Sequence, residues 1–118
     1  MADEREDALV VADLIEACRL VVRFAGGLDE RDFRNNPLVW SAVSFQIIVL
    51  GEAVKSRLSE DVCDRYPQIS WKDIKGMRDK LSHRHVSLDL GEVWRAARGN
   101  IPELLDELLT IERDLIGS

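Results

Sequence analysis

Apolar residues recur at intervals of three and four along nearly the whole chain, and this spacing restricts the possible folds more than any other feature. One such stripe near the N-terminus consists of Val10, Leu14, Ala17, Val21 and Phe24, and a second apolar stripe lies beside it. These intervals place side chains on one face of an α-helix, whereas a half-buried strand requires strict alternation. The width of the combined face predicts a helix that packs against more than one neighbour.

Residues that start or stop helices divide the chain into segments. Gly26–Gly27 ends the first segment, because glycine readily adopts the left-handed conformation that follows many helices. Asn36–Pro37 is a typical helix start, Gly99–Asn100 is expected to break a helix, and Pro102 to open the last one. The expected helical segments are 4–25, 29–33, 37 to about 58, 60–66, one that begins after Ser70, one that begins after Asp89, and a C-terminal helix.

The segment Ser70-Trp71-Lys72-Asp73 is the best-defined helix start in the sequence. It has the pattern of a capping box, in which the first and fourth residues exchange side-chain hydrogen bonds with each other's backbone N–H. Ile69 and Ile74 occupy the positions of a hydrophobic staple. We expect this helix to fray near 82–85, because Val86–Ser87 is poor helix sequence.

The segment 38–50 is apolar nearly all round, which is typical of a helix at the centre of a bundle. A length of 118 residues is that of one ordinary domain, so we treat 1–118 as a single unit. The sequence therefore predicts an all-α, up-and-down bundle of four main helices with short helical turns between them.

The charge of the chain is acidic overall but uneven along its length. The formal net charge is −6, which argues against a protein that grips nucleic acid by bulk positive charge. Residues 1–16 carry a net charge of −5, whereas residues 72–84 carry +3. Contact with a polyanion is therefore expected in the second of these segments.

Cysteine usage and the N-terminal sequence bear on the compartment. Cys18 and Cys63 show neither zinc nor redox-motif spacing, so we expect two free thiols in a reducing environment. The N-terminus is charged from the start, without the pattern of a secretory signal. We also expect no apolar run with a length near 18 residues. This predicts that the chain has no membrane span and is located in the cytoplasm.

The segment 77–85, Met-Arg-Asp-Lys-Leu-Ser-His-Arg-His, holds both histidines of the protein. Phosphate loops, dinucleotide fingerprints, nucleophile elbows and the H-E-x-x-H motif are all absent. His83 and His85 lack a third ligand for a metal ion, so no metal site is predicted. From composition alone, these residues are better explained as solvated groups at a helix end, where cations are favoured by the helix dipole.

Helix geometry sets a condition on any site in this segment. Arg78 and His83 are five residues apart, about 140° around an ideal helix, so one copy of the pair does not share a face. Two copies brought together by a two-fold axis would make a better site, since a symmetric interface duplicates each residue.

An ordered series of motifs along residues 9–109 resembles the HepT-like (DUF86) branch of the HEPN domains. Its centre is an arginine followed by a histidine four to six residues later, here Arg78 and His83. The other matching residues are Phe24, Gly27-Leu28, Phe33, Ala42-Val43, Ile48-Val49-Leu50-Gly51-Glu52-Ala53, Tyr66-Pro67, Ile69, Trp71, Ile74, Gly76-Met77, Leu81, Asp89 and Val93-Trp94.

The resemblance implies a homodimeric all-α ribonuclease toxin that pairs with a small MNT-type nucleotidyltransferase antitoxin and cleaves RNA without metal or cofactor. Arg78 and His83 take the positions of the family's catalytic arginine and histidine. Histidine suits proton transfer near neutral pH, and arginine can hold a phosphate with two hydrogen bonds.

Supporting roles are expected for several neighbours of the motif. Asp79 can orient Arg78 or His83, or be a solvated charge, and Glu52 is expected to pair with a cation of the site. His85, which stands where many members have tyrosine, can assist the chemistry or bind phosphate, and its presence argues against control by tyrosine modification. The predicted RNA phosphate contacts are Lys75, Lys80 and Arg84.

Two other functions remain open at this point. One is a non-catalytic HEPN module that binds a nucleotide or regulates a partner nucleotidyltransferase. The other is a purely structural helical dimer, in which Arg78 and His83 can be replaced by glutamine without effect.

Overall fold

The computed structural model describes residues 4–83 and 89–117, which are helical throughout apart from short connections. Four main helices are joined by shorter ones, and the described residues contain no strand, which confirms the predicted all-α, up-and-down bundle. The main helices are α1 (Glu4–Ala25), α3 (Pro37–Ser56), α5 (Trp71–Ser82) and α7 (Ile101–Gly117), and the short ones are α2 (Glu30–Arg34), α4 (Glu60–Arg65) and α6 (Leu90–Arg95).

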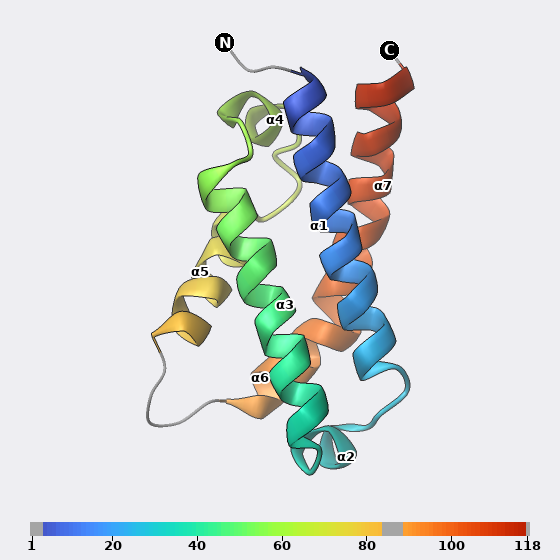
Figure 1. Cartoon of the computed structure of the whole chain (residues 1–118), viewed down its shortest axis with the longest axis vertical. Coiled ribbons are helices and arrows are strands. Elements are labelled where there is room, and N and C mark those ends of the chain that lie inside the picture. Colours follow the sequence, from blue (N-terminus) through green and yellow to red (C-terminus); the bar gives the residue numbers. More distant parts are fainter. Residues whose placement is uncertain (1–3, 84–88, 118) are drawn as a thin grey trace.

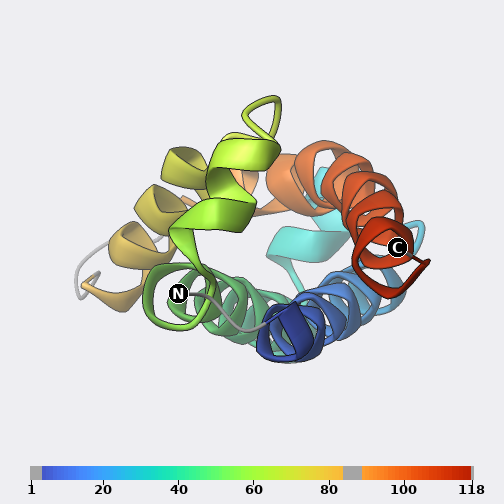
Figure 2. The same ribbon diagram turned by 90° about the horizontal axis from the view of Figure 1, so that it is seen from above.

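The four main helices lie in a curved row rather than in a closed ring. α5 packs mainly on α3, α3 on α1, and α1 on α7, whereas α5 and α7 make few contacts with each other in the described residues. Figures 1 and 2 show this order, with α5 and α7 at the two ends of the row. One side of α5 therefore packs on α3, and another side lies open toward α7.

Most helix starts follow the predicted caps. Asp29, Asn36 and Asp89 each accept a hydrogen bond from a backbone N–H of the first helical turn. Gly27 follows α1 with a φ of 82°, a conformation that glycine adopts without strain. α3 ends at Ser56, two residues before the predicted limit.

The predicted capping box at Ser70 was wrong. Ser70 is the N-cap of α5, but its side chain makes no capping hydrogen bond. The N–H of Asp73, which a capping box would use, donates instead to the backbone carbonyl of Ser70 at 3.0 Å. The Asp73 N–H is therefore satisfied without the serine hydroxyl.

The predicted helix break at Gly99–Asn100 was also wrong. Residues Ala96–Asn100 form a π-helical segment that joins α6 to α7 without interruption, and the Ile101 N–H bonds to the Ala96 carbonyl five residues back. Pro102 has no N–H, and in an α-helix its ring would clash with the carbonyl four residues earlier. The wider π geometry accommodates this proline within a continuous helix.

The helix α3 corrects one expectation and refines another. By length and composition it is the one helix in the described part of the chain that could cross a membrane, so the expected absence of such a run was wrong. Its packing between α1 and α5 explains the same composition as that of a core helix. However, it exposes Leu38, Phe45 and Val49, with 82 %, 60 % and 37 % of each residue accessible, so it is not covered on all sides.

Both cysteines are free thiols, as predicted, but they differ in environment. Cys18 is fully buried in the core, and desolvation raises its pKa to about 12. Cys63 is half-buried, and burial raises its pKa to a smaller extent.

We expect iodoacetamide at pH 8 to label Cys63 and to leave Cys18 unmodified until the protein unfolds, because only the thiolate reacts. Mass spectrometry of the native and urea-unfolded protein measures this difference. Labelling of Cys18 at the same rate as Cys63 in the native protein would contradict its burial.

Candidate functional site

Arg78 lies at a close crossing of α5 and α3. A Cβ added to Gly51 of α3 would collide with Cβ of Arg78, and would lie 2.9 Å from Cγ of Arg78 and 3.0 Å from the carbonyl oxygen of Ile74. The glycine therefore lets the two helix backbones approach where the arginine stem crosses α3. The fold holds the base of the Arg78 side chain in place through this contact.

Two carboxylates hold the guanidinium of Arg78. Its Nη2 lies 2.6 Å from Oε2 of Glu52, and its Nη1 lies 2.9 Å from Oδ1 of Asp79. Only 20 % of the Arg78 side chain is exposed, and its Nε is buried without a hydrogen-bond partner in the described part of the protein. Each terminal nitrogen keeps a second N–H, so the group can still donate to a phosphate.

The ion pairs also fix the charge states of this cluster. The hydrogen bond from Arg78 holds the pKa of Asp79 below its ordinary value, with Lys55, Arg78 and His83 adding to the effect through their charges. The pKa of Arg78 is raised, first by the hydrogen bond to Asp79 and then by the charge of Glu52. Arg78 therefore stays cationic and Asp79 anionic at neutral pH.

His83 is the residue at which α5 ends. Its backbone N–H bonds to the Asp79 carbonyl at 3.1 Å, and its side chain is exposed. α5 remains helical through Ser82, so its end falls within the region near 82–85 where the sequence predicted it, and residues 84 and 85 lie outside the described residues. No hydrogen bond joins His83 to Arg78 in the described structure, so one subunit alone does not assemble the two side chains into a single site.

The predicted phosphate-binding lysines lie on different sides of α5. Lys75 precedes Asp79 by one turn, so it shares the side of α5 that carries Arg78 and Asp79. Lys80 instead pairs with Glu92 of α6 at 3.0 Å, toward the open side of α5. Arg84 and His85 lie outside the described residues.

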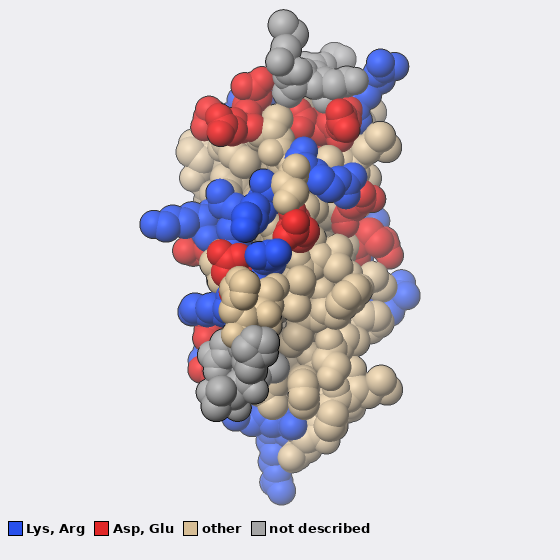
Figure 3. Space-filling model, turned by 60° about the vertical axis from the view of Figure 1, so that its left-hand side comes forward, with Lys and Arg blue, Asp and Glu red and all other residues tan. Residues whose placement is uncertain are grey.

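Lys55 was not predicted from the sequence, and Gly51 was named only as a residue of the family motif, without a role. Lys55 acts on Asp79 through its charge, and it follows Glu52 by three residues on α3, so the helical spacing was an available signal. Lys55, Lys75 and Arg78 together are the cations on this side of the molecule that we assign to the candidate site. Figure 3 shows basic side chains in a band across this face, with acidic side chains among them.

No metal centre is evident in the described residues. They contain no group of three or more histidine, cysteine, aspartate or glutamate side chains that could hold a metal ion.

The close crossing at Gly51 leads to a stability prediction. We expect Gly51→Ala to lower the free energy of unfolding by about 1–3 kcal/mol, because the new methyl group forces α3 and α5 apart. Gly76→Ala on α5 is the matched control, since a Cβ there meets nothing within 4 Å. It should be neutral or stabilising, and equal urea midpoints for the two variants would contradict the crossing described here.

Comparison with known proteins agrees with this architecture. The family model described as "Ribonuclease HepT-like" matches residues 14–111, nearly the whole chain. The protein belongs to the HepT-like family. This confirms the predicted resemblance to that family. No solved structure matches the chain.

Individual HepT-like relatives cover most of this chain. A Methanocaldococcus jannaschii protein named "Putative RNase MJ1216" is 33 % identical over 114 residues, which are 97 % of this chain and 93 % of that protein. A second protein of the same organism, "Putative RNase MJ0125", is 34 % identical over 95 % of this chain and 96 % of its own. "Probable ribonuclease HepT" of Thermococcus cleftensis is 30 % identical over 78 % of this chain and 83 % of its own.

Proposed function

We propose that this HepT-like protein is a metal-independent endoribonuclease, and that it acts as the toxin of a HEPN/MNT-type toxin–antitoxin pair. The observation that carries the proposal is the cluster around Arg78, in which Glu52 and Asp79 hold the guanidinium five residues before His83. The family membership and the names of its relatives support the same activity.

The proposed reaction is a transfer of the RNA phosphate within the substrate. The ribose 2′-oxygen attacks the adjacent phosphorus, the bond from phosphorus to the 5′-oxygen breaks, and a 2′,3′-cyclic phosphate and a free 5′-hydroxyl result. One His83 removes the proton from the 2′-hydroxyl, and the His83 of a second subunit gives a proton to the leaving oxygen. Arg78 stabilises the negative charge that develops on the phosphate.

The exposed face of α3 supports a homodimer as the active form. Leu38, Phe45 and Val49 lie on one side of α3 because they are spaced by seven and four residues, and Glu52 continues the same side. Figure 3 shows a wide uncharged surface below the charged band on this side of the molecule. Pairing two copies through this face would bury exposed apolar side chains and bring two Arg78 clusters to the edge of one interface.

Cleavage of RNA by the purified protein tests the proposed activity. We expect cleavage of single-stranded RNA in EDTA at the rate seen with Mg²⁺, with products that end in a 2′,3′-cyclic phosphate, as resolved by mass spectrometry. Intact RNA under both conditions would rule out the ribonuclease. Cleavage that requires Mg²⁺ would rule out the acid–base mechanism.

A non-catalytic role is favoured by one specific observation. Glu52 and Asp79 both occupy the guanidinium of Arg78, and carboxylates at this position oppose the approach of RNA phosphate. In this second function the protein binds a partner nucleotidyltransferase and regulates it. Recovery of a stable complex with a nucleotidyltransferase encoded beside this protein, together with an absence of RNA cleavage, would select this function over the first.

A further inference from the structure

A groove of about 750 Å³ lies on the open side of α5, between α5 and α7. It exists because these two helices end the row and do not pack on each other. Its floor is apolar and includes Ile47 and Leu50 of α3 and Leu104 of α7. The groove uses a different side of α5 from the candidate site, since Arg78 is not among the residues that line it.

A bare stretch of helix backbone forms part of the groove wall. Gly76 lines the groove in the middle of α5, and a Cβ placed on it would meet nothing within 4 Å. Glycine in a helix interior is destabilising relative to alanine. The glycine at position 51 is explained by the close approach of α5 to α3. At Gly76, no described part of the chain occupies the space that a side chain would fill.

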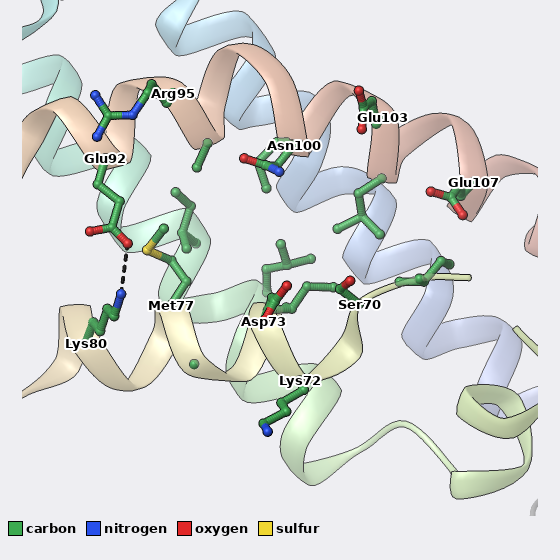
Figure 4. A pocket seen from close by; sticks show the side chains of 18 of the residues that line it. Ser70, Lys72, Asp73, Met77, Lys80, Glu92, Arg95, Asn100, Glu103 and Glu107 are labelled. Atoms are coloured by element: carbon green, nitrogen blue, oxygen red, sulfur yellow. Dashed lines mark hydrogen bonds and ion pairs between the residues drawn. The ribbon is translucent and has the colours of Figure 1, made fainter. Parts of the chain in front are cut away.

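One end of the groove rim carries three carboxylates that are unpaired in the described part of the protein, whereas the other end carries Lys80, Glu92 and Arg95. Asp73 of α5 and Glu103 and Glu107 of α7 make no side-chain hydrogen bond or ion pair within the described residues, and Lys72 is the one unpaired cation beside them. At the other end Lys80 and Glu92 neutralise each other. Figure 4 shows Asp73 on one side of the groove, with Glu103 and Glu107 on the other, and the Lys80–Glu92 pair at the far end.

The π-helical segment Ala96–Asn100 contributes to the same groove. Ala96 and Asn100 line it, and Figure 4 shows the amide of Asn100 directed into it. Segments of π-helix within longer helices are frequent at functional sites. An apolar floor, a polar side chain above it and a bare backbone on the opposite wall are the features of a surface that receives another helix.

We propose that the α5–α7 groove binds an amphipathic helix of a partner protein, which crosses α5 at Gly76. The partner helix places a small residue against Gly76, apolar residues on the floor, and lysine or arginine residues against Asp73, Glu103 and Glu107. Basic side chains follow from the charge complementarity of the rim. Because α5 also carries Arg78, the bound helix contacts the element that positions the candidate site, whether or not that site cleaves RNA.

The test uses two fluorescein-labelled peptides of 16 residues with the same alanine and leucine stripe. One carries lysines beside the stripe and the other glutamates, and binding to the full-length protein is measured by fluorescence anisotropy. We expect the lysine peptide to bind at least tenfold more tightly than the glutamate peptide. Absence of binding by the lysine peptide at 100 µM overturns the proposal.

Matched variants locate the bound peptide. Gly76→Leu, which fills the crossing point, should weaken binding of the lysine peptide at least tenfold, whereas Gly117→Leu, also open to space, should not. Glu107→Lys on the rim should weaken binding several-fold, and Asp106→Lys beside it should not. Equal binding to the members of each pair would show attraction to the acidic surface in general and overturn the proposal.

Two further outcomes would assign the groove to another occupant and overturn the proposal. A change in sedimentation mass caused by Gly76→Leu would show that the groove holds a second copy of this chain. Direct binding of fluorescein-labelled single-stranded RNA to the wild-type protein, weakened at least tenfold by Gly76→Leu, would show that the groove is a nucleic-acid site.

Discussion

His83→Ala should lower the rate of RNA cleavage by about 10²–10⁴-fold, which is the usual contribution of a positioned acid–base group. The expected loss is the largest of any single substitution in this protein, because each dimer would lose both the proton acceptor and the proton donor. Initial rates of cleavage of a fluorescent RNA oligonucleotide, measured for wild type and variant at equal protein concentration, give the ratio.

The position of His83 separates an effect on the reaction from an effect on protein stability. His83 is exposed at the end of α5, so its imidazole contributes little to packing, and the melting temperature should stay near that of the wild type. Lys72→Ala, an exposed change at the other end of the same helix, is the matched control and should retain activity. Wild-type cleavage by His83→Ala would remove the imidazole from the mechanism.

Arg78→Ala should lower cleavage by about 10²–10³-fold, because one charge-stabilising donor of the transition state is lost. The substitution also leaves Glu52 and Asp79 facing the phosphate without their cation, which adds repulsion between like charges. Single-turnover rates at saturating RNA separate the effect on chemistry from the effect on binding.

Arg78→Lys distinguishes geometry from charge. Lysine keeps the positive charge but cannot reproduce the planar fork that reaches Glu52 and Asp79 at once. We expect this variant to bind RNA with an affinity close to that of the wild type and to cleave it at a strongly reduced rate. Full activity in Arg78→Lys would show that a point charge suffices and that the two ion pairs have no positioning role.

The sequence predicted the helices well because their signals are local. The apolar stripes, the Asn36–Pro37 start and the Asp89 cap act over one or two turns, and each appears in the structure. Two of the three wrong expectations arose where the backbone had an alternative geometry. Asp73 satisfied its N–H through the Ser70 carbonyl, and Pro102 was accommodated by π-helical geometry rather than by a break.

The candidate site was only partly predictable, because its geometry depends on which helices pack together. The pairing of Glu52 with a cation was expected because Glu52 is polar within a mainly apolar helix, and the structure shows that its partner is Arg78. The crossing at Gly51 and the charge of Lys55 act between α3 and α5, which are distant in sequence. The placement of Lys80 toward the groove likewise required knowledge of α6.

We propose that two copies of the Arg78–His83 segment form one active site. Sedimentation of the Phe45→Glu variant, combined with its rate of RNA cleavage, tests this arrangement. If the active form is a dimer, the wild-type protein sediments at twice the 13.4 kDa mass of the chain. The folded variant, with a charge on the exposed face of α3, should sediment as one chain and lose at least about 10²-fold in cleavage. A monomeric Phe45→Glu that cleaves RNA at the wild-type rate would contradict the shared site.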